Sequence, residues 1–167
     1  YPLFSDILFC DEKYRVVIEN FLEPYMNHYV VDYISEAIYA LNLLSESARG
    51  RAHFFIIEEV NQYFDAHKKS DIQVNNPDLI PALSIISVEG KYEKLCKILL
   101  VNLFIIENDK LDENFELPDK SIIILHKSGK FIKNKLGISG GSIGLFEGKR
   151  IGRAKNLENL HAEIKAH

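Results

Sequence analysis

Two stretches of this chain, one in each half, carry the same order of residues, and this repetition limits the folds open to it. DEKYRVVIENFL at residues 11–22 resembles VEGKYEKLCKILL at residues 88–100, with Lys13 aligned on Lys91 at an offset of 78 residues. Both stretches space their apolar residues as one face of a helix does. A repeat of this kind indicates a structural unit that occurs twice.

Each helical stretch lies between two apolar runs. DILFC precedes and HYVVD follows the first, while ALSIISV precedes and NLFIIE follows the second. The repeated unit is therefore strand–helix–strand, which implies a mixed α/β fold with helices packed on sheets. We expect two pseudo-repeated lobes, and in each lobe one sheet that buries a face under its helix.

The rest of the first half predicts one more helix and one more strand. RAHFFIIEEV at residues 51–60 predicts a strand, in which Glu58 and Glu59 would point to opposite faces and could not act together. Residues 61–81 are polar and contain two prolines, so they predict the connection between the lobes. Before Gly50, where a helix would stop, apolar residues recur at helical spacing at Ile34, Ala37, Ile38, Leu41 and Leu44.

The second half predicts a loop, a hairpin and a terminal helix. Residues 107–119 are acidic and rich in turn formers, which is typical of an exposed loop. Ser121–His126 and Lys130–Lys133, joined through Ser128-Gly129, predict a β-hairpin. Apolar residues at helical spacing from residue 154 predict a helix that continues beyond this piece of chain. We expect the chain, which begins at Tyr1, to be part of a longer protein.

Composition favours a folded cytoplasmic domain with an uneven charge. The apolar fraction of 47% supplies a core, and no apolar run is long enough to span a membrane. Cys10 and Cys96 lack metal-ligand spacing, so we expect reduced thiols in apolar surroundings. Residues 120–155 hold nine basic residues and one acid, a net charge of +8 that leaves −12 for the rest. This basic segment predicts either a surface for an anionic partner or an ordinary solvated face.

No arrangement of residues predicts an active site. The acids are scattered, the six histidines have no ligand spacing, and Cys96 lies in a helical apolar pattern that favours the core. His28, His53 and His126 lie beside apolar runs or at a strand end, and we expect structural or surface roles for them. We therefore expect no catalytic residue, no metal and no cofactor in this chain.

A glycine-rich segment, NKLGISGGSIGLFEGKRIG, runs from residue 134 to residue 152 and admits two interpretations. A glycine loop before a helix can hold a phosphate, but this one has neither G-x-G-x-x-G nor the P-loop pattern. Glycines also let two backbones approach closely, because they carry no Cβ. The first interpretation predicts a small-molecule-binding α/β enzyme domain that uses SGGSIG as an anion site. The second predicts a close contact between chains.

In their order and spacing, the motifs resemble the hinge domain of bacterial SMC (structural maintenance of chromosomes) proteins, most closely the Bacteroidetes type. The resemblance rests on PLFSDILFCDEKYRVVIENFL, GRAHFFI, ALSIISVEGKYEKL, IIILHKSGKFIKNKLGISGGSIG and FEGKRIGRAKNLENL. It implies a first lobe at residues 1–80, a second lobe at 81–146 and the start of an outgoing coiled-coil arm at 147–167. It also implies an SMC hinge-like α/β (α+β) fold in which each lobe meets the other lobe of a partner copy.

The resemblance further implies a function and a set of contact residues. The chain would be the non-enzymatic dimerisation hinge of a nucleoid-associated ATPase that organises and segregates chromosomal DNA, with ATP and kleisin bound by other parts of that protein. A related long-coil protein of DNA repair or plasmid partition remains an alternative. The family's G-G-S-x-x-G-G contact pattern falls on Gly140, Gly141 and Ser142, but Gly144 comes one residue early and Leu145-Phe146 replace the usual second glycine pair. Weak, sequence-independent DNA contact would fall on the basic residues Lys130, Lys133, Lys135, Lys149, Arg150, Arg153 and Lys155.

Overall fold

The computed structural model describes residues 1–47, 50–67, 72–141 and 151–152. The predicted helix after residue 153 lies outside these ranges. The first repeat contains, in chain order, α1 (Phe4–Ile7), β1 (Phe9–Cys10), the 3-10 helix η1 (Glu12–Tyr14), α2 (Arg15–Phe21), η2 (Glu23–Tyr25), β2 (Tyr29–Val31), α3 (Ile34–Ser47), β3 (Phe54–Ile56) and α4 (Ile57–Ala66).

The second repeat follows the same order before it diverges. It contains β4 (Leu79–Pro81), η3 (Ala82–Ser84), β5 (Ile86–Ser87), η4 (Gly90–Tyr92), α5 (Glu93–Leu100), β6 (Leu103–Ile106), β7 (Ile123–His126), β8 (Phe131–Asn134) and β9 (Gly137–Gly140). The predicted duplication is confirmed, since β2 pairs with β3 in parallel and β6 pairs with β7 in parallel. The predicted hairpin is confirmed as β7–β8.

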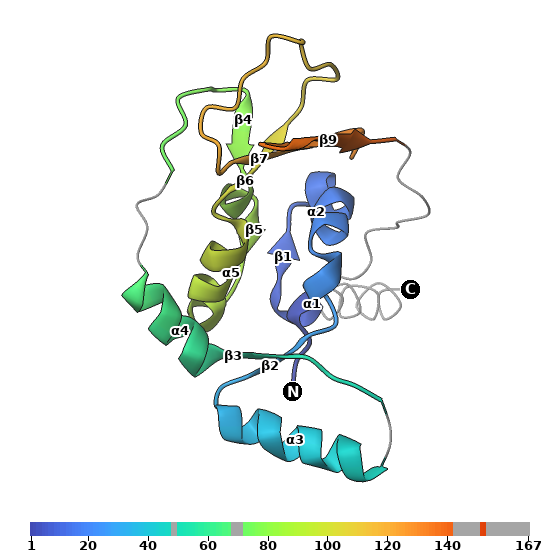
Figure 1. The fold of residues 1–167 in the computed structure, drawn as a ribbon, viewed down its shortest axis with the longest axis vertical. Helices are drawn as coiled ribbons and strands as arrows, with labels where there is room; N and C mark the ends of the chain where they lie inside the picture. The colour runs from blue at the N-terminus through green and yellow to red at the C-terminus, as the bar shows by residue number, and fades with distance from the viewer. Residues whose placement is uncertain (48–49, 68–71, 142–150, 153–167) are drawn as a thin grey trace, which may run out of the picture.

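The two repeats meet at their equivalent strands. β1 and β5 pair antiparallel, and Phe9 lies opposite Ser87, the residue 78 positions later. An antiparallel pair of equivalent strands relates its two sides by a local two-fold axis. In Figure 1, α2 and α5 lie on either side of this ribbon, the β2–β3 sheet lies below it and the larger sheet lies above it.

Ion pairs between the repeats follow the same symmetry. The ammonium group of Lys13 contacts the carboxylate of Glu107, which follows β6, at 2.5 Å. The aligned Lys91 contacts Asp32, which follows β2, at 2.7 Å. In each repeat, therefore, the lysine pairs with the acid that follows β2 or β6 of the other repeat. Because all four side chains are about half exposed to water, each pair adds little to stability.

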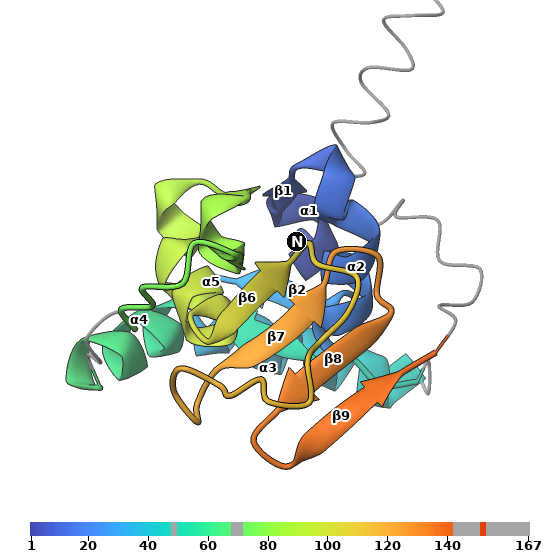
Figure 2. The ribbon, with the colours of Figure 1, turned by 90° about the horizontal axis from the view of Figure 1, so that it is seen from above.

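The strands form three sheets, whereas the repeat predicted one sheet for each lobe. Besides β1–β5 and β2–β3, a five-stranded sheet runs in the order β4-β6-β7-β8-β9. Figure 2 shows this larger sheet from above, with β9 at its outer edge. The third sheet arises because β1 and β5, the equivalent strands of the two repeats, pair with each other instead of joining the sheet of their own repeat. The second repeat's sheet is also larger, since it adds the β8–β9 hairpin where the first repeat has α4.

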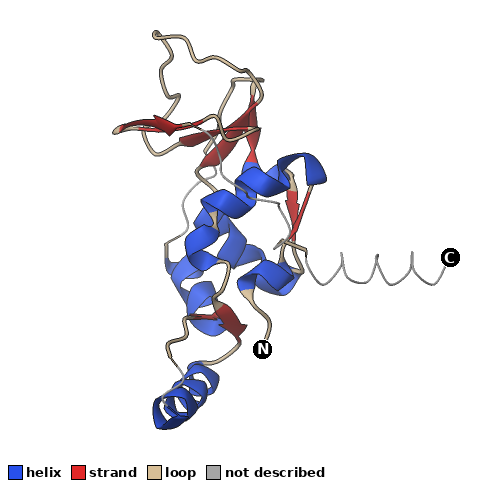
Figure 3. Cartoon of the chain, turned by 90° about the vertical axis from the view of Figure 1, so that its right-hand side faces the viewer, coloured by secondary structure: helices blue, strands red, loops and turns tan. Residues whose placement is uncertain are grey.

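A single apolar core extends through both repeats. It contains residues of α1, α2 and β2 from the first repeat together with residues of α5, β6 and β7 from the second. α1, α2 and α5 lie between the two outer sheets, whereas α3 lies beyond the β2–β3 sheet, as Figure 1 and Figure 3 show. A smaller cluster covers the other face of the five-stranded sheet, where Phe115 and Leu117 of the predicted loop pack against Phe104 and Ile122. β6 is therefore buried along its whole length.

The predicted strand at residues 51–60 is wrong beyond Ile56. α4 begins at Ile57, and the main-chain N–H of Glu58 donates to the carbonyl of Asp32 at 3.0 Å. Glu58 and Glu59 thus lie in the first turn of a helix, where negative charge opposes the positive end of the helix dipole. The helix also takes up the first residues of the predicted inter-lobe connection.

Candidate self-association surface

β9 is a free sheet edge. One side of the strand pairs with β8, and its other side pairs with no strand in the described part of the chain. All four residues of β9 are exposed, and the flanking Leu136 and the central Ile138 are 88% and 60% exposed. Exposed, flat, apolar edges pair readily with another strand. The opposite edge, β4, ends in Pro81, which cannot donate a main-chain hydrogen bond.

Gly140 and Gly141 are required by the β8–β9 hairpin itself. A Cβ at Gly140 would collide with the carbonyl oxygen of Lys130, and the N–H of Gly141 donates to that oxygen at 3.2 Å. Gly141 also has φ +130°, a conformation that favours glycine. The sequence assigned both glycines to a contact between chains, and this contact inside one chain was not predicted. Ser142 and Gly144 lie outside the described residues.

The first repeat has an empty strand position that the second repeat fills. In the second repeat, β8 lies beside β7. In the first repeat, β3 takes the place of β7, and its outer edge pairs with no strand among the described residues. The other side of β2 is covered, because Leu3 bridges to Tyr29 and Val30 donates its N–H to the carbonyl of Pro2 at 2.8 Å.

α3 carries apolar residues that the chain leaves exposed. Of the predicted stripe only Ala37 is buried, whereas Ile34, Ile38 and Leu41 are between 43% and 50% exposed. These three residues lie at i, i+4 and i+7, so they form one stripe along the helix. In Figure 1, α3 lies beneath the β2–β3 sheet, at the opposite end of the molecule from β9. Within the described ranges, apolar side chains are therefore exposed on β9 and on α3, at opposite ends of the molecule, and each end has a strand edge that no described strand pairs with.

The described basic candidates gather on the β8–β9 hairpin but are partly engaged. Lys130 lies 3.3 Å from the carboxylate of Asp109, and Lys133 donates to the carbonyls of Asn134 and Gly137 at 2.9 and 3.4 Å. Lys135 lies in the exposed β8–β9 turn. The other four basic candidates, Lys149, Arg150, Arg153 and Lys155, lie outside the described residues.

His126 has a structural role, as the sequence predicted. Its ring is fully buried, and its Nδ1 accepts the main-chain N–H of Ser128 at 3.0 Å. The other ring nitrogen, Nε2, therefore carries the proton and donates to Asp109 at 3.2 Å. Lys130, and to a lesser extent His126, lowers the pKa of the Asp109 carboxyl. These contacts tie the loop after β6 to the β7–β8 turn.

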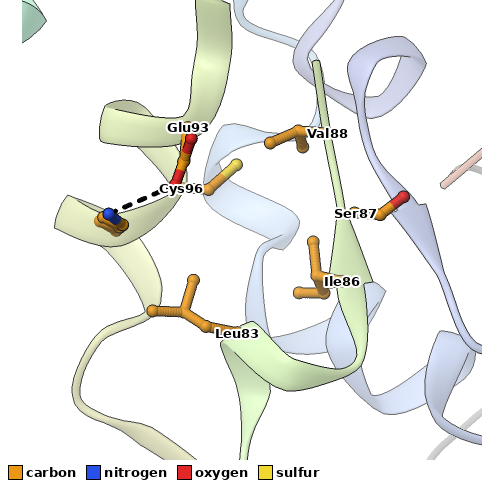
Figure 4. Close-up of a pocket in the computed structure, with 7 residues that line it drawn as sticks. Leu83, Ile86, Ser87, Val88, Glu93 and Cys96 are labelled. Atoms are coloured by element: carbon orange, nitrogen blue, oxygen red, sulfur yellow. Dashed lines mark ion pairs between the residues drawn. The ribbon is translucent and has the colours of Figure 1, made fainter. Parts of the chain in front are cut away.

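Both cysteines are poor nucleophiles. Cys96 borders a cavity of about 260 Å³ between α5 and β5, together with Leu83, Ile86 and Val88. Figure 4 shows this apolar lining, with the ion pair between Glu93 and Lys97 beside it. Burial raises the thiol pKa of both Cys10 and Cys96 to about 12, so both remain protonated at neutral pH.

The described residues do not favour the enzyme interpretation. That interpretation requires a pocket near SGGSIG, but three cavities in the structure lie between α5 and β5, beside β1, and beside α3, and none of the three is lined by Ser139, Gly140 or Gly141. Within the described ranges, no group of three or more potential ligands could hold a metal ion. Nor does any described helix combine the length and apolarity needed to cross a membrane.

Fold and surface together define a class of protein: a duplicated α+β module in which β9 and β3, at opposite ends, each have one edge that pairs with no strand in the described part of the chain. The sequence profile of the family described as SMC proteins Flexible Hinge Domain matches residues 1–110. This chain belongs to that family. Among curated proteins, none matches the chain.

Solved structures agree with this assignment. A crystal structure of an asymmetric dimer of the Geobacillus stearothermophilus SMC hinge domain has a TM-score of 0.68 at 17% identity, over 99% of this chain and 67% of that one. The Pyrococcus furiosus SMC hinge domain has a TM-score of 0.63 at 22% identity, over 87% of this chain and 75% of that one. A structure described as the folded elbow of cohesin has a TM-score of 0.70 at 20% identity, over 99% of this chain but only 23% of that one. The mixed α+β fold is thus that of SMC hinge domains.

Proposed function

We propose that this chain is the homodimerisation hinge of a bacterial SMC ATPase of the Bacteroidetes type. In the full-length protein it would join two coiled-coil arms, while distant parts bind ATP and kleisin. The protein would act in the cytoplasm, on the nucleoid, to organise and segregate chromosomal DNA. The observation that carries the proposal is the pair of unpaired edges, β9 in one repeat and β3 in the other.

The two edges suit each other. The second repeat shows how a strand can pair with the outer edge of β3. There, β8 lies antiparallel to β7, the strand that is equivalent to β3. In the dimer, β9 of one copy takes that position beside β3 of the other. The β2–β3 sheet and the five-stranded sheet then become one sheet that continues across the boundary between copies. Main-chain hydrogen bonds supply affinity in such strand additions.

The apolar surfaces favour the same arrangement. Leu136 precedes β9 and Ile138 lies within it, and α3, the helix that carries the apolar stripe, lies beneath the β2–β3 sheet. A strand added to β3 would bring Ile138 of one copy toward the α3 stripe of the other, so that both surfaces lose contact with water. Because each copy offers one β9 edge and one β3 edge, a two-fold dimer closes four edges at once. Such closure prevents open-ended assembly.

Sedimentation of the chain and of one charged variant tests this proposal. We expect a dimer at micromolar concentration, and we expect Ile138→Lys to sediment as a folded monomer, because the charge would be buried in the new interface. Tyr63→Lys is the matched control, since Tyr63 on α4 is a large hydrophobic residue with a similar exposure, 55%. A monomeric unsubstituted chain, or an Ile138→Lys variant that still dimerises, would contradict the proposal.

We also propose weak DNA contact through the basic residues of the β8–β9 hairpin and of the following segment. Lys135 supports this proposal best, because it lies exposed in the β8–β9 turn, whereas Lys130 and Lys133 already have partners. Binding through phosphates would be independent of sequence and sensitive to salt.

A further inference from the structure

A buried carboxylate of the first repeat holds the far end of the described chain. Glu19 on α2 is only 2% exposed, and it accepts the main-chain N–H of Ile151 at 2.5 Å, across 132 residues of sequence. Ile151 itself is completely buried in the shared core. The N–H of Gly152 donates to the carbonyl of Ser5 on α1 at 3.3 Å.

The fold alone does not require this buried acid, as the internal repeat shows. The residue aligned with Glu19 on α5 is Lys97, whose side chain is 41% exposed and pairs with Glu93 one turn earlier. The repeat thus tolerates an exposed base at the position where the first repeat buries an acid. Burying a carboxylate is costly unless it accepts hydrogen bonds. The hydrogen bond from Ile151, which has no counterpart at Lys97, is one of the interactions that compensate this cost.

The same segment also touches the ribbon that joins the repeats. Gly152 has φ +68°, a turn conformation that favours glycine. A Cβ added at Gly152 would lie 3.7 Å from the carbonyl oxygen of Leu8 and 3.9 Å from the ring of Phe9, the first residue of β1. Because β1 pairs with β5, Gly152 lies beside the ribbon that joins the first repeat to the second.

We propose that Glu19 is a docking residue: it fixes Ile151 and Gly152 to the first repeat and so anchors the start of the chain that follows them. That the chain after Gly152 is a coiled-coil arm rests on the proposed function, whereas the docking does not. Displacement of the segment would act first on α2 and β1, and through β1 on the relative position of the two repeats.

Hydrogen exchange of the whole chain tests the docking. We expect Glu19→Ala to speed exchange of the Ile151 amide by about tenfold to a hundredfold, the range given by the loss of a hydrogen bond to a charged group. Exchange in β6, and dimer mass in sedimentation, should stay unchanged. Glu19→Gln, which keeps a carbonyl acceptor of the same shape, should retain most of the protection. Lys97→Ala, the matched change in the second repeat, should leave Ile151 unaffected.

Two results would overturn the proposal. One is unchanged exchange at Ile151 in a folded Glu19→Ala variant. The other is faster exchange in β6 as well as at Ile151 in both Glu19 variants, since that would make Glu19 a general support of the core. If the unsubstituted chain proved to be a monomer, that result would contradict the proposed function only. The docking proposal would stand, because the protection of the Ile151 amide depends on contacts within one copy.

Discussion

Gly140 faces the main-chain carbonyl of Lys130 across the β8–β9 hairpin, so closely that no Cβ could fit between them. The glycine therefore has a role before any second copy arrives. A substitution at this position changes the strand edge itself, and its effect on association follows from that change.

We expect Gly140→Ala to destabilise the folded chain by about 1–3 kcal/mol, as overpacking against fixed backbone does. Combined with Gly141→Ala it should also weaken dimerisation, because β9 would be displaced from the plane of the sheet. Thermal unfolding and sedimentation of the same samples measure the two effects. A double variant with normal stability and normal mass would contradict this expectation.

Gly137→Ala separates the interface from the fold. A Cβ at Gly137 meets no atom within 4 Å, and the same is true of Gly90 in the distant η4. Neither substitution should lower the free energy of unfolding of a single copy. At the dimer boundary, however, the added methyl group at Gly137 would meet the partner, so we expect a higher dissociation constant for Gly137→Ala only. Equal dissociation constants for the two variants would argue against β9 as the contact strand.

Mixing two monomeric variants tests the reciprocal geometry. Ile138→Lys damages the β9 side of the interface and Ile38→Lys damages the α3 side, so each variant alone has two damaged interfaces. A heterodimer of the two would have one interface damaged on both sides and one left intact. We expect heterodimers in native mass spectrometry of the mixture and monomers in each separate sample. A mixture that stays monomeric would exclude two equivalent, reciprocal interfaces.

DNA binding should depend on salt and on the exposed lysine. We expect affinity for a single-stranded oligonucleotide to fall as salt rises, and Lys135→Ala to reduce the slope of log K against log salt by about 0.7. Lys94→Ala on α5, where the lysine is paired with Asp65, is the control. Fluorescence anisotropy measures this affinity between low and moderate salt. An affinity that does not change with salt would contradict binding through phosphates.

The two thiols should lower the free energy of unfolding at alkaline pH. Their pKa rises from 9.0 to about 12 on folding, so the protonated thiols stabilise the native state fully below pH 9. That contribution is lost progressively as the pH rises from 9 through 12. At pH 8, iodoacetamide should modify Cys10 and Cys96 much faster in denaturant than in the native chain. Fast modification of both native thiols would contradict their burial.

The sequence predicted the duplication well because apolar periodicity and the aligned lysines are local features that survive in each repeat. It misplaced the boundary between β3 and α4, since the apolar run FFII continues through Ile56 and Ile57 without any glycine or proline to mark a change. The carbonyl of Asp32, which accepts the N–H of Glu58, comes from another part of the chain and leaves no local pattern.

The roles of Gly140 and Glu19 could not be predicted from the sequence for a related reason. Gly140 lies in a motif that suggested a contact between chains, while the carbonyl that demands a glycine belongs to Lys130, on the neighbouring strand. Glu19 resembles an ordinary surface acid of a helix, and its partner Ile151 is 132 residues away. Contacts of this range become visible only when the topology is known.

The common core of the two repeats has a mechanical consequence. Because residues from α2 and β2 pack in the same cluster as residues from α5, β6 and β7, unfolding of either repeat would expose the core of the other. A tensile load on the module would therefore meet cooperative resistance within each copy. In the proposed dimer we expect rupture to begin at the boundary between copies, where only a short strand edge and the side chains beside it hold the two together.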